Sequence, residues 1–328
     1  MYKIVQNNIK RDSTIDSLKG FLIILVILGH LIGQCGGTDI VNNNIWTYIY
    51  IFHMPLFILL SGYFSKKVDD LKYFYRSLLK IFLPLILFQL INILMLCIVR
   101  GGKLGMSYFV VPYWTLWYLL SLICWRVILQ IAPNCLLKKH ILILVLSICL
   151  SLICGLVPYG RIFSIQRTLN FFPFFLLGYY MRDRKKILWN KYVAYSMLVI
   201  MFFMVVFNLF PPNSPLLLRG ADQYSLWDLP AKVYILICSF IMSISVLSIF
   251  KPLSLLASIG KDSLLYYLYH GVIISYIIVP LTNLCDIPNN ILYLSGYCIL
   301  IVLSIRLLCR FRIFRWFAYP LANLSKSR

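Results

Sequence analysis

The stretch "SLKGFLIILVILGHLIG", from Ser17 to Gly33, has the length and the apolar character of a membrane-spanning helix. It departs from that character at two points, with Lys19 near one end and His30 near the other. Ionisable side chains are costly inside a bilayer, so they usually face the interior of a helical bundle or a wet cavity. The stretch therefore indicates a membrane fold and also a place where function is to be sought.

The composition extends the membrane interpretation to the whole chain. Of its 328 residues, 61% are hydrophobic and only 12% are charged, and the mean hydropathy is +0.86. A soluble globular protein carries about a quarter charged residues and under half apolar ones. Because long apolar runs recur along the whole length, we predict a polytopic integral membrane protein.

Ten segments are long and apolar enough to be expected as membrane spans. They cover residues 16–34, 45–64, 78–99, 114–131, 140–158, 166–181, 191–210, 226–250, 262–281 and 290–309. We therefore predict an all-α bundle of about ten transmembrane helices. The bundle is expected to form one integral-membrane domain over residues 1–328.

The formal net charge of +21 is explained by the loops of such a bundle. Lys and Arg are concentrated in alternate short loops, as in the run "RDRKK" from Arg182 to Lys186, and the loops between them are poor in bases. The positive-inside rule then places both termini in the cytoplasm. No nucleic-acid partner is expected, because no stretch outside the apolar runs is long enough to fold into a basic domain.

The cysteines do not suggest a metal site. The ten of them form no CxxC pair and no Cys/His spacing that suits zinc. Most lie in apolar runs, where a free thiol behaves as a small hydrophobic group. Cys35 and Cys285 both fall in loops that are predicted to lie outside, so a disulfide between them stays open.

Lys19 and His30 are eleven residues apart. On an α-helix this spacing puts both side chains on one stripe, about 16 Å apart along the axis. A buried imidazole bonded to a neighbouring helix is the structural alternative for His30. The lysine on the same stripe and the other histidines within spans favour a functional role.

Two more histidines fall within predicted spans. His53 precedes Pro55, whose missing backbone N–H permits a kink or a cavity, and packing at such a kink is the alternative reading of His53. His270 follows "YYLY", whose tyrosines are also consistent with aromatic packing alone. Other ionisable residues within the spans are Arg126, Asp228 and Lys232.

Arg167 and Trp117 are expected at outer edges of spans. Arg167 precedes "TLNFFPFFLLGYY" and either binds an anionic or hydroxylated acceptor or anchors the helix at the interface. Trp117 belongs to "PYWTLWYLL", which either stacks on the face of a sugar or forms an interfacial aromatic belt.

Five blocks of sequence occur in order between residues 11 and 270. They are "RDSTIDSLKGFLIILVILGH", "FHMPLFILLSGYF", "LWYLLSL", "FFPFFLLGYY" and "IGKDSLLYYLYH". Together they resemble the successive signature blocks of the membrane-bound acyltransferase family 3. The most similar branch is that of the fucose 4-O-acetylase-like sugar O-acetyltransferases.

The resemblance implies a multi-pass protein of a cell membrane, expected to be the bacterial inner or cytoplasmic membrane. It implies transfer of an acetyl group from cytoplasmic acetyl-CoA, as donor substrate, to a hydroxyl of a surface glycan or its lipid-linked precursor. The family's basic-x10-His motif falls on Lys19 and His30. His30 is then the base or the acyl carrier, because a histidine changes its protonation near neutral pH, and His53 is the second catalytic candidate.

The resemblance also implies a set of donor-binding bases. The family's paired basic residues on the third span are carried over as Arg76 and Lys80. Arg11 is expected to support the donor phosphates. Asp16 is expected to hold this region through local hydrogen bonds or a pair with Lys19. For Arg11 and Asp16, a solvated surface position is the alternative.

A carrier or flippase for a glycan or an anion is the rival function. In such a protein the same intramembrane charges would line a transport path. Secondary transporters commonly show internal repeats with paired broken helices, and the sequence shows none. The acyltransferase is therefore the leading interpretation.

Overall fold

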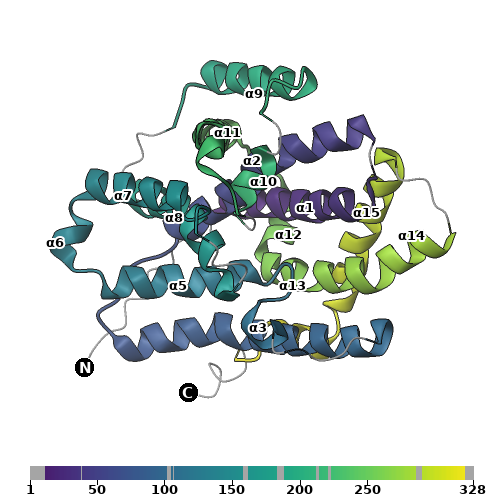
Figure 1. Cartoon of the computed structure of the whole chain (residues 1–328). Coiled ribbons are helices and arrows are strands. Elements are labelled where there is room, and N and C mark those ends of the chain that lie inside the picture. Colours follow the sequence, from purple (N-terminus) through teal and green to yellow (C-terminus); the bar gives the residue numbers. More distant parts are fainter. Residues whose placement is uncertain are drawn as a thin grey trace.

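The protein, represented here by a computed structural model, is described over residues 12–37, 39–101, 105, 107–157, 162–182, 188–211, 214–220, 223–285 and 290–321. These residues form helices and connecting turns, with no β-strand among them (Figure 1). The predicted all-α class is confirmed. Arg11 lies outside the described residues.

Each of the ten expected segments coincides with a helix. The long helices are α1 (Ser13–Cys35), α2 (Ile40–Tyr63), α3 (Leu71–Arg100), α5 (Trp117–Ile131), α7 (His140–Ile153), α8 (Ile165–Met181), α9 (Lys191–Val206), α11 (Leu229–Ile249), α13 (Ser263–Ile273) and α15 (Ile291–Leu308). Helix α13 continues through a π-helical turn, Ile274–Ile278, into α14 (Val279–Cys285).

Short helices connect or flank these elements. They are α4 (Ser107–Val110), α6 (Asn134–Leu137), α10 (Ser214–Arg219), α12 (Ser254–Lys261) and α16 (Arg312–Ala318), with 3₁₀ turns at Ile162–Ser164 and Leu226–Asp228. At the position of α12, a loop between two spans was expected.

Six helices of the described residues are long and apolar enough to cross a membrane. They are α1, α2, α3, the segment Leu226–Ile249, the segment Ser263–Cys285 and α15. Helices α5, α7 and α9 are apolar but shorter. The fold is that of a membrane protein. The total of ten spans and the cytoplasmic placement of the termini stay predictions.

The long helices lie side by side, with α3 and α9 along opposite edges of the bundle in Figure 1. Helix α1 contacts α2, α12, α13 and α15, so it occupies the interior. Helix α3 instead exposes an apolar row at helical spacing, made of Leu79, Phe82, Ile86, Leu90 and Leu94. A surface of this kind suits contact with lipid.

Helix α1 is held to the short helix α12 by a reciprocal pair of glycines. A Cβ on Gly20 would overlap the carbonyl oxygen of Leu256, and a Cβ on Gly260 would overlap that of Asp16. Small residues allow two helix backbones to approach closely in this way. The two backbones therefore touch near the Lys19 end of α1.

A side-chain bond completes this junction. The Ser17 hydroxyl donates to the Leu253 carbonyl oxygen at 2.9 Å and accepts from the Leu253 N–H at 3.0 Å. Asp16 is only 3% exposed at the same place, in the first turn of α1. The solvated-surface alternative for Asp16 is therefore wrong, because α12 covers it.

Helices α2 and α8 cross at a second reciprocal glycine pair. A Cβ on Gly62 would overlap the Phe175 carbonyl oxygen, and one on Gly178 would overlap the Leu59 carbonyl oxygen. This crossing fixes α2 against α8. It thereby sets the position of His53, on α2, relative to the residues of α8.

The disulfide left open for Cys35 and Cys285 is not formed, and both thiols are free. Cys35 is the buried last residue of α1, where its Sγ lies 3.8 Å from Thr282 Oγ1. Cys285 is exposed at the end of α14. The two cysteines terminate helices and do not lie in the loops that were expected.

Candidate active site

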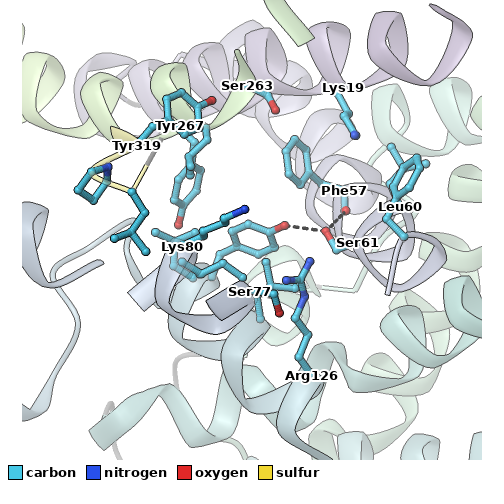
Figure 2. A pocket seen from close by; sticks show the side chains of 18 of the residues that line it. Lys19, Phe57, Leu60, Ser61, Ser77, Lys80, Arg126, Ser263, Tyr267 and Tyr319 are labelled. Atoms are coloured by element: carbon cyan, nitrogen blue, oxygen red, sulfur yellow. Dashed lines mark hydrogen bonds between the residues drawn. The ribbon is translucent and has the colours of Figure 1, made fainter. Parts of the chain in front are cut away.

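A cavity of about 550 Å³ lies among α1, α2, α3, α5, α13 and residues 319–321, which follow α16. Its cations come from three different helices, with Lys19 on α1, Lys80 on α3 and Arg126 on α5. Figure 2 shows these three side chains reaching into the same space from different sides. No Asp or Glu is among the described residues that line it. We call it the cationic cavity.

One wall of the cationic cavity carries bonded hydroxyls (Figure 2). Ser61 Oγ donates to the Phe57 carbonyl oxygen at 2.9 Å and lies 2.6 Å from Tyr118 Oη. A serine hydroxyl has one hydrogen to donate, so Tyr118 is the donor in the second bond. Above this wall, Lys19 Nζ lies 4.3 Å from the ring centroid of Phe64, within the range of a cation–π contact.

The structure separates the four residues that were expected to bind the donor. Lys19 and Lys80 line the cationic cavity. Arg76 is exposed on α3, one turn before Lys80, and is not among the lining residues. Arg126 takes a place in the cavity that the resemblance did not assign to it. A lone arginine within an apolar span was the signal for it.

A second cavity, of about 270 Å³, is bounded by α1, α2, α8, α10, α13 and the turn before α5. Four of the residues singled out in the sequence line it, namely His30, His53, Trp117 and Arg167. His270 packs behind His30, with ring centroids 5.4 Å apart and an interplanar angle of 21°. We call this space the histidine cavity.

Hydrogen bonds assign the protons of two of these rings. His53 Nδ1 lies 2.8 Å from the Ile49 carbonyl oxygen, and His270 Nδ1 lies 2.9 Å from that of Tyr266. Because a carbonyl only accepts, each Nδ1 carries a hydrogen, and the neutral ring keeps its lone pair on Nε2. His270 Nε2 is buried without a hydrogen-bond partner.

His30 is oriented by aromatic neighbours. Its Nδ1 lies 3.3 Å from Tyr50 Oη, and its ring centroid lies 4.7 Å from that of Trp114. Tyr50 was not singled out in the sequence. Its place three residues before His53 was the available signal, because residues at this spacing share a helix face.

Two arginines give the histidine cavity its positive charge. The Arg167 guanidinium lies 5.2 Å from the ring centroid of Trp117, and its Nη1 donates to the Trp114 carbonyl oxygen at 3.5 Å. Arg219, the last residue of α10, also lines the cavity. No Asp or Glu is among the described lining residues, so the imidazoles have no carboxylate beside them there.

A buried amine holds α10 in place. Lys232 is fully buried, and its Nζ donates to the Leu217 carbonyl oxygen at 2.7 Å and to Asn170 Oδ1. Asn170 Nδ2 in turn donates to the Leu218 carbonyl oxygen. Both carbonyls immediately precede Arg219. The sequence placed Arg219 in an outer loop, and nothing in that loop indicates this attachment.

The described residues form no visible ligand set for a metal ion. Within the described ranges, no group of three or more His, Cys, Asp or Glu side chains is arranged to hold a metal ion. The histidine cavity supplies imidazoles beside cationic and aromatic groups. This set can accept a proton, carry an acyl group or stabilise an oxyanion.

The comparison with protein families decides the class. The family model described as "Acyltransferase domain" matches residues 12–309, which is nearly the whole chain. The chain belongs to the membrane-bound acyltransferase family 3. Together with the six apolar helices, this makes it a membrane acyltransferase.

Two curated relatives are similar to this acyltransferase, and each is named Nodulation protein NolL. That of Sinorhizobium fredii (strain NBRC 101917 / NGR234) is 33% identical over 188 residues, covering 52% of this chain and 48% of the relative. That of Mesorhizobium japonicum (strain LMG 29417 / CECT 9101 / MAFF 303099) is 48% identical over 59 residues, covering 17% and 16%. The chain thus spans at most about half the length of these relatives. No solved structure matches it.

Proposed function

We propose that this acyltransferase moves an acetyl group from cytoplasmic acetyl-CoA to a hydroxyl of a surface glycan or its lipid-linked precursor. One observation carries the proposal. Helix α1 lines a cationic cavity with Lys19 and a histidine cavity with His30, and the two cavities adjoin at Tyr267. A donor with a polyanionic head and a reactive far end fits such a pair of sites.

The cationic cavity is assigned to the head of coenzyme A. Its phosphates are attracted by Lys19, Lys80 and Arg126, since charge-assisted hydrogen bonds to phosphate are among the strongest in proteins. The slim pantetheine arm then runs along α1 for about 16 Å, the rise of eleven helical residues. This length brings the thioester to His30.

The acyl step needs a base and a site for the oxyanion. His30 takes the proton of the acceptor hydroxyl, whose oxygen attacks the thioester carbonyl carbon. The tetrahedral intermediate then expels the coenzyme A thiolate, which takes up the proton, and the acetyl ester remains on the acceptor. Arg167 and Arg219 are positioned to stabilise the oxyanion. A two-step route through an acetyl-imidazole on His30 uses the same residues.

The acceptor is assigned to the histidine cavity. Trp117 and Trp114 line it, as do Trp46 and Tyr50. Aromatic side chains of this kind offer a large apolar face and a polar edge, which suits a sugar ring with its hydroxyls. The predicted cytoplasmic placement of the termini puts this cavity in the outer half of the membrane, where a glycan or lipid-linked sugar is reached.

The proposal is tested with purified protein in proteoliposomes that contain lipid-linked sugars. Radiolabelled acetyl-CoA should yield a labelled sugar lipid, and omission of the protein should abolish the label. Movement of the sugar across the bilayer with no need for acetyl-CoA, and with no label transferred, would instead identify a carrier. NMR of the surface glycan from cells with and without the gene then identifies the acylated hydroxyl.

A further inference from the structure

The cationic cavity and the histidine cavity meet at one side chain. Tyr267, on α13, is the only described residue that lines both, and it is 4% exposed. Figure 2 shows it on the side of the cationic cavity away from Leu60. Its ring packs edge-on against Tyr118, with centroids 5.3 Å apart, and lies 6.0 Å from the ring of His270. A phenol ring therefore forms the common wall.

The side chain of Tyr267 is held in place by the turn before α5. Its hydroxyl donates to the backbone carbonyl of Thr115, in the turn before α5. The same turn is close to α13 one helical turn further on, because a Cβ on Gly271 would lie 2.9 Å from Thr115 Oγ1. Tyr267 thus bridges two elements and has little room to move.

The turn that accepts this bond is strained. Trp114 has a φ of 27°, in the left-handed region that a non-glycine residue rarely adopts. Such a residue persists only where the surrounding contacts hold it, and it is often found at functional sites. The Trp114 ring also packs against His30. The bond from Tyr267 therefore helps to hold the wall and the imidazole in one arrangement.

We propose that Tyr267 is a specificity-determining residue, whose ring sets the largest acyl group that reaches His30. The inference rests on the proposed function. A thioester anchored by its phosphates in the cationic cavity has to bring its acyl carbon past this wall. An acetyl group adds a single methyl beyond the carbonyl carbon. An acyl group longer than acetyl places further methylenes against this ring, which its bond to Thr115 holds in place.

The chain offers a matched control on the same helix. Tyr269 is also buried, and its hydroxyl also donates to a backbone carbonyl, that of Phe314, at 2.9 Å. It lines neither cavity. Tyr269→Ala and Tyr267→Ala remove the same atoms from α13. A difference in acyl-chain preference between the two variants therefore shows that the effect depends on the place of Tyr267 between the cavities.

The experiment measures transfer from acetyl-, propionyl-, butyryl- and hexanoyl-CoA in proteoliposomes. The transfer rate of the wild-type protein should fall steeply for acyl groups longer than acetyl. Tyr267→Ala should raise the butyryl-to-acetyl rate ratio by about tenfold or more, the discrimination that one or two methylenes carry in a closed pocket. Tyr267→Phe keeps the ring but loses the bond to Thr115, so its ratio should rise less than that of Tyr267→Ala. Tyr269→Ala should keep the wild-type profile. Tyr267→Leu replaces the alanine variant if that variant does not fold.

The outcomes separate the two proposals. Acetyl transfer by wild type with an unchanged chain-length profile in Tyr267→Ala or Tyr267→Leu overturns the role of Tyr267 and leaves the proposed function intact. An equal shift in Tyr269→Ala overturns it as well. Loss of transfer at every chain length in Tyr267→Phe would show that the hydroxyl takes part in the reaction. It would overturn the proposal that the ring selects the acyl group by size. Wild type that transfers no acyl group from any of these thioesters overturns both proposals.

Discussion

The two cavities differ in how their functional groups are held. In the cationic cavity, Lys19 and Lys80 reach inward on long side chains from separate helices, and Lys80 is exposed. In the histidine cavity, His53 is buried and bonded to the backbone carbonyl of Ile49, and His270 is fully buried behind His30. Flexible cations suit a large polyanion that arrives and leaves. Fixed rings suit a reaction that needs its groups already in place.

This difference predicts a division in kinetics. A group that binds the donor equally in the ground state and the transition state changes KM when it is removed, with little effect on kcat. A group that acts only in the transition state changes kcat. Substitutions in the cationic cavity should therefore raise the KM for acetyl-CoA, and substitutions in the histidine cavity should lower kcat.

The largest effect is expected for His30→Ala. Loss of positioned acid–base catalysis typically lowers a rate by about a hundred- to ten-thousand-fold. The protein should still insert, because the substitution makes its span more apolar. Transfer of label from acetyl-CoA, measured at matched protein abundance in membranes, checks both points.

His140→Ala is the control for this variant. His140 begins α7 and is not among the residues of either cavity, so its substitution should leave the rate within about twofold, as is usual for positions away from buried features. A His30→Ala rate within a few-fold of wild type would return His30 to a structural role, as an imidazole bonded to Tyr50.

The second effect is expected for Lys19→Ala. One lost hydrogen bond to a charged group costs about 1.5–3 kcal/mol, so the KM for acetyl-CoA should rise about tenfold or more. The kcat should recover at high donor concentration. Lys19→Arg should bind at least as well, because a guanidinium engages phosphate with two parallel bonds. A fall in kcat with unchanged KM would contradict the division between the cavities.

The helices of the fold could largely be predicted from the sequence, but which helices pack against one another could not. Apolar length is a property of each segment, so all ten segments were found helical. The docking of α12 on α1 depends on Gly20 and Gly260 facing each other, which no local pattern reveals. An eight-residue helix is also too short to be detected as a span.

The candidate site was only partly predictable for a similar reason. His30, His53, Arg167 and Trp117 stood out because polar or interfacial residues are rare within apolar runs, and they share one cavity. Arg219 did not stand out, since a loop arginine is ordinary. Lys232 and Asn170 bond to the carbonyls of the two residues before it and so hold this end of α10 at the cavity. Such attachments arise from tertiary structure.

A third and smaller effect is expected on α3, where Lys80 and Arg76 give a direct comparison. Lys80 lines the cationic cavity and Arg76 does not. Lys80 is exposed and therefore screened by solvent, so Lys80→Ala should raise the KM for acetyl-CoA only about three- to fivefold, in line with the modest strength of exposed ion pairs. Arg76→Ala should stay within about twofold. Equal effects would restore Arg76 to the donor site.

The smallest effect is expected for Tyr50→Phe, which removes only the hydroxyl 3.3 Å from His30 Nδ1. A neutral hydrogen bond contributes about 0.5–1.5 kcal/mol, so kcat should fall about two- to tenfold as the imidazole loses its orientation. The KM for acetyl-CoA should not change, because Tyr50 lines only the histidine cavity. Tyr48→Phe is the matched control, since that hydroxyl donates to the Leu198 carbonyl oxygen at 3.2 Å and faces neither cavity. A rise in donor KM in Tyr50→Phe alone would show that the thioester, and not the acceptor, rests against this ring.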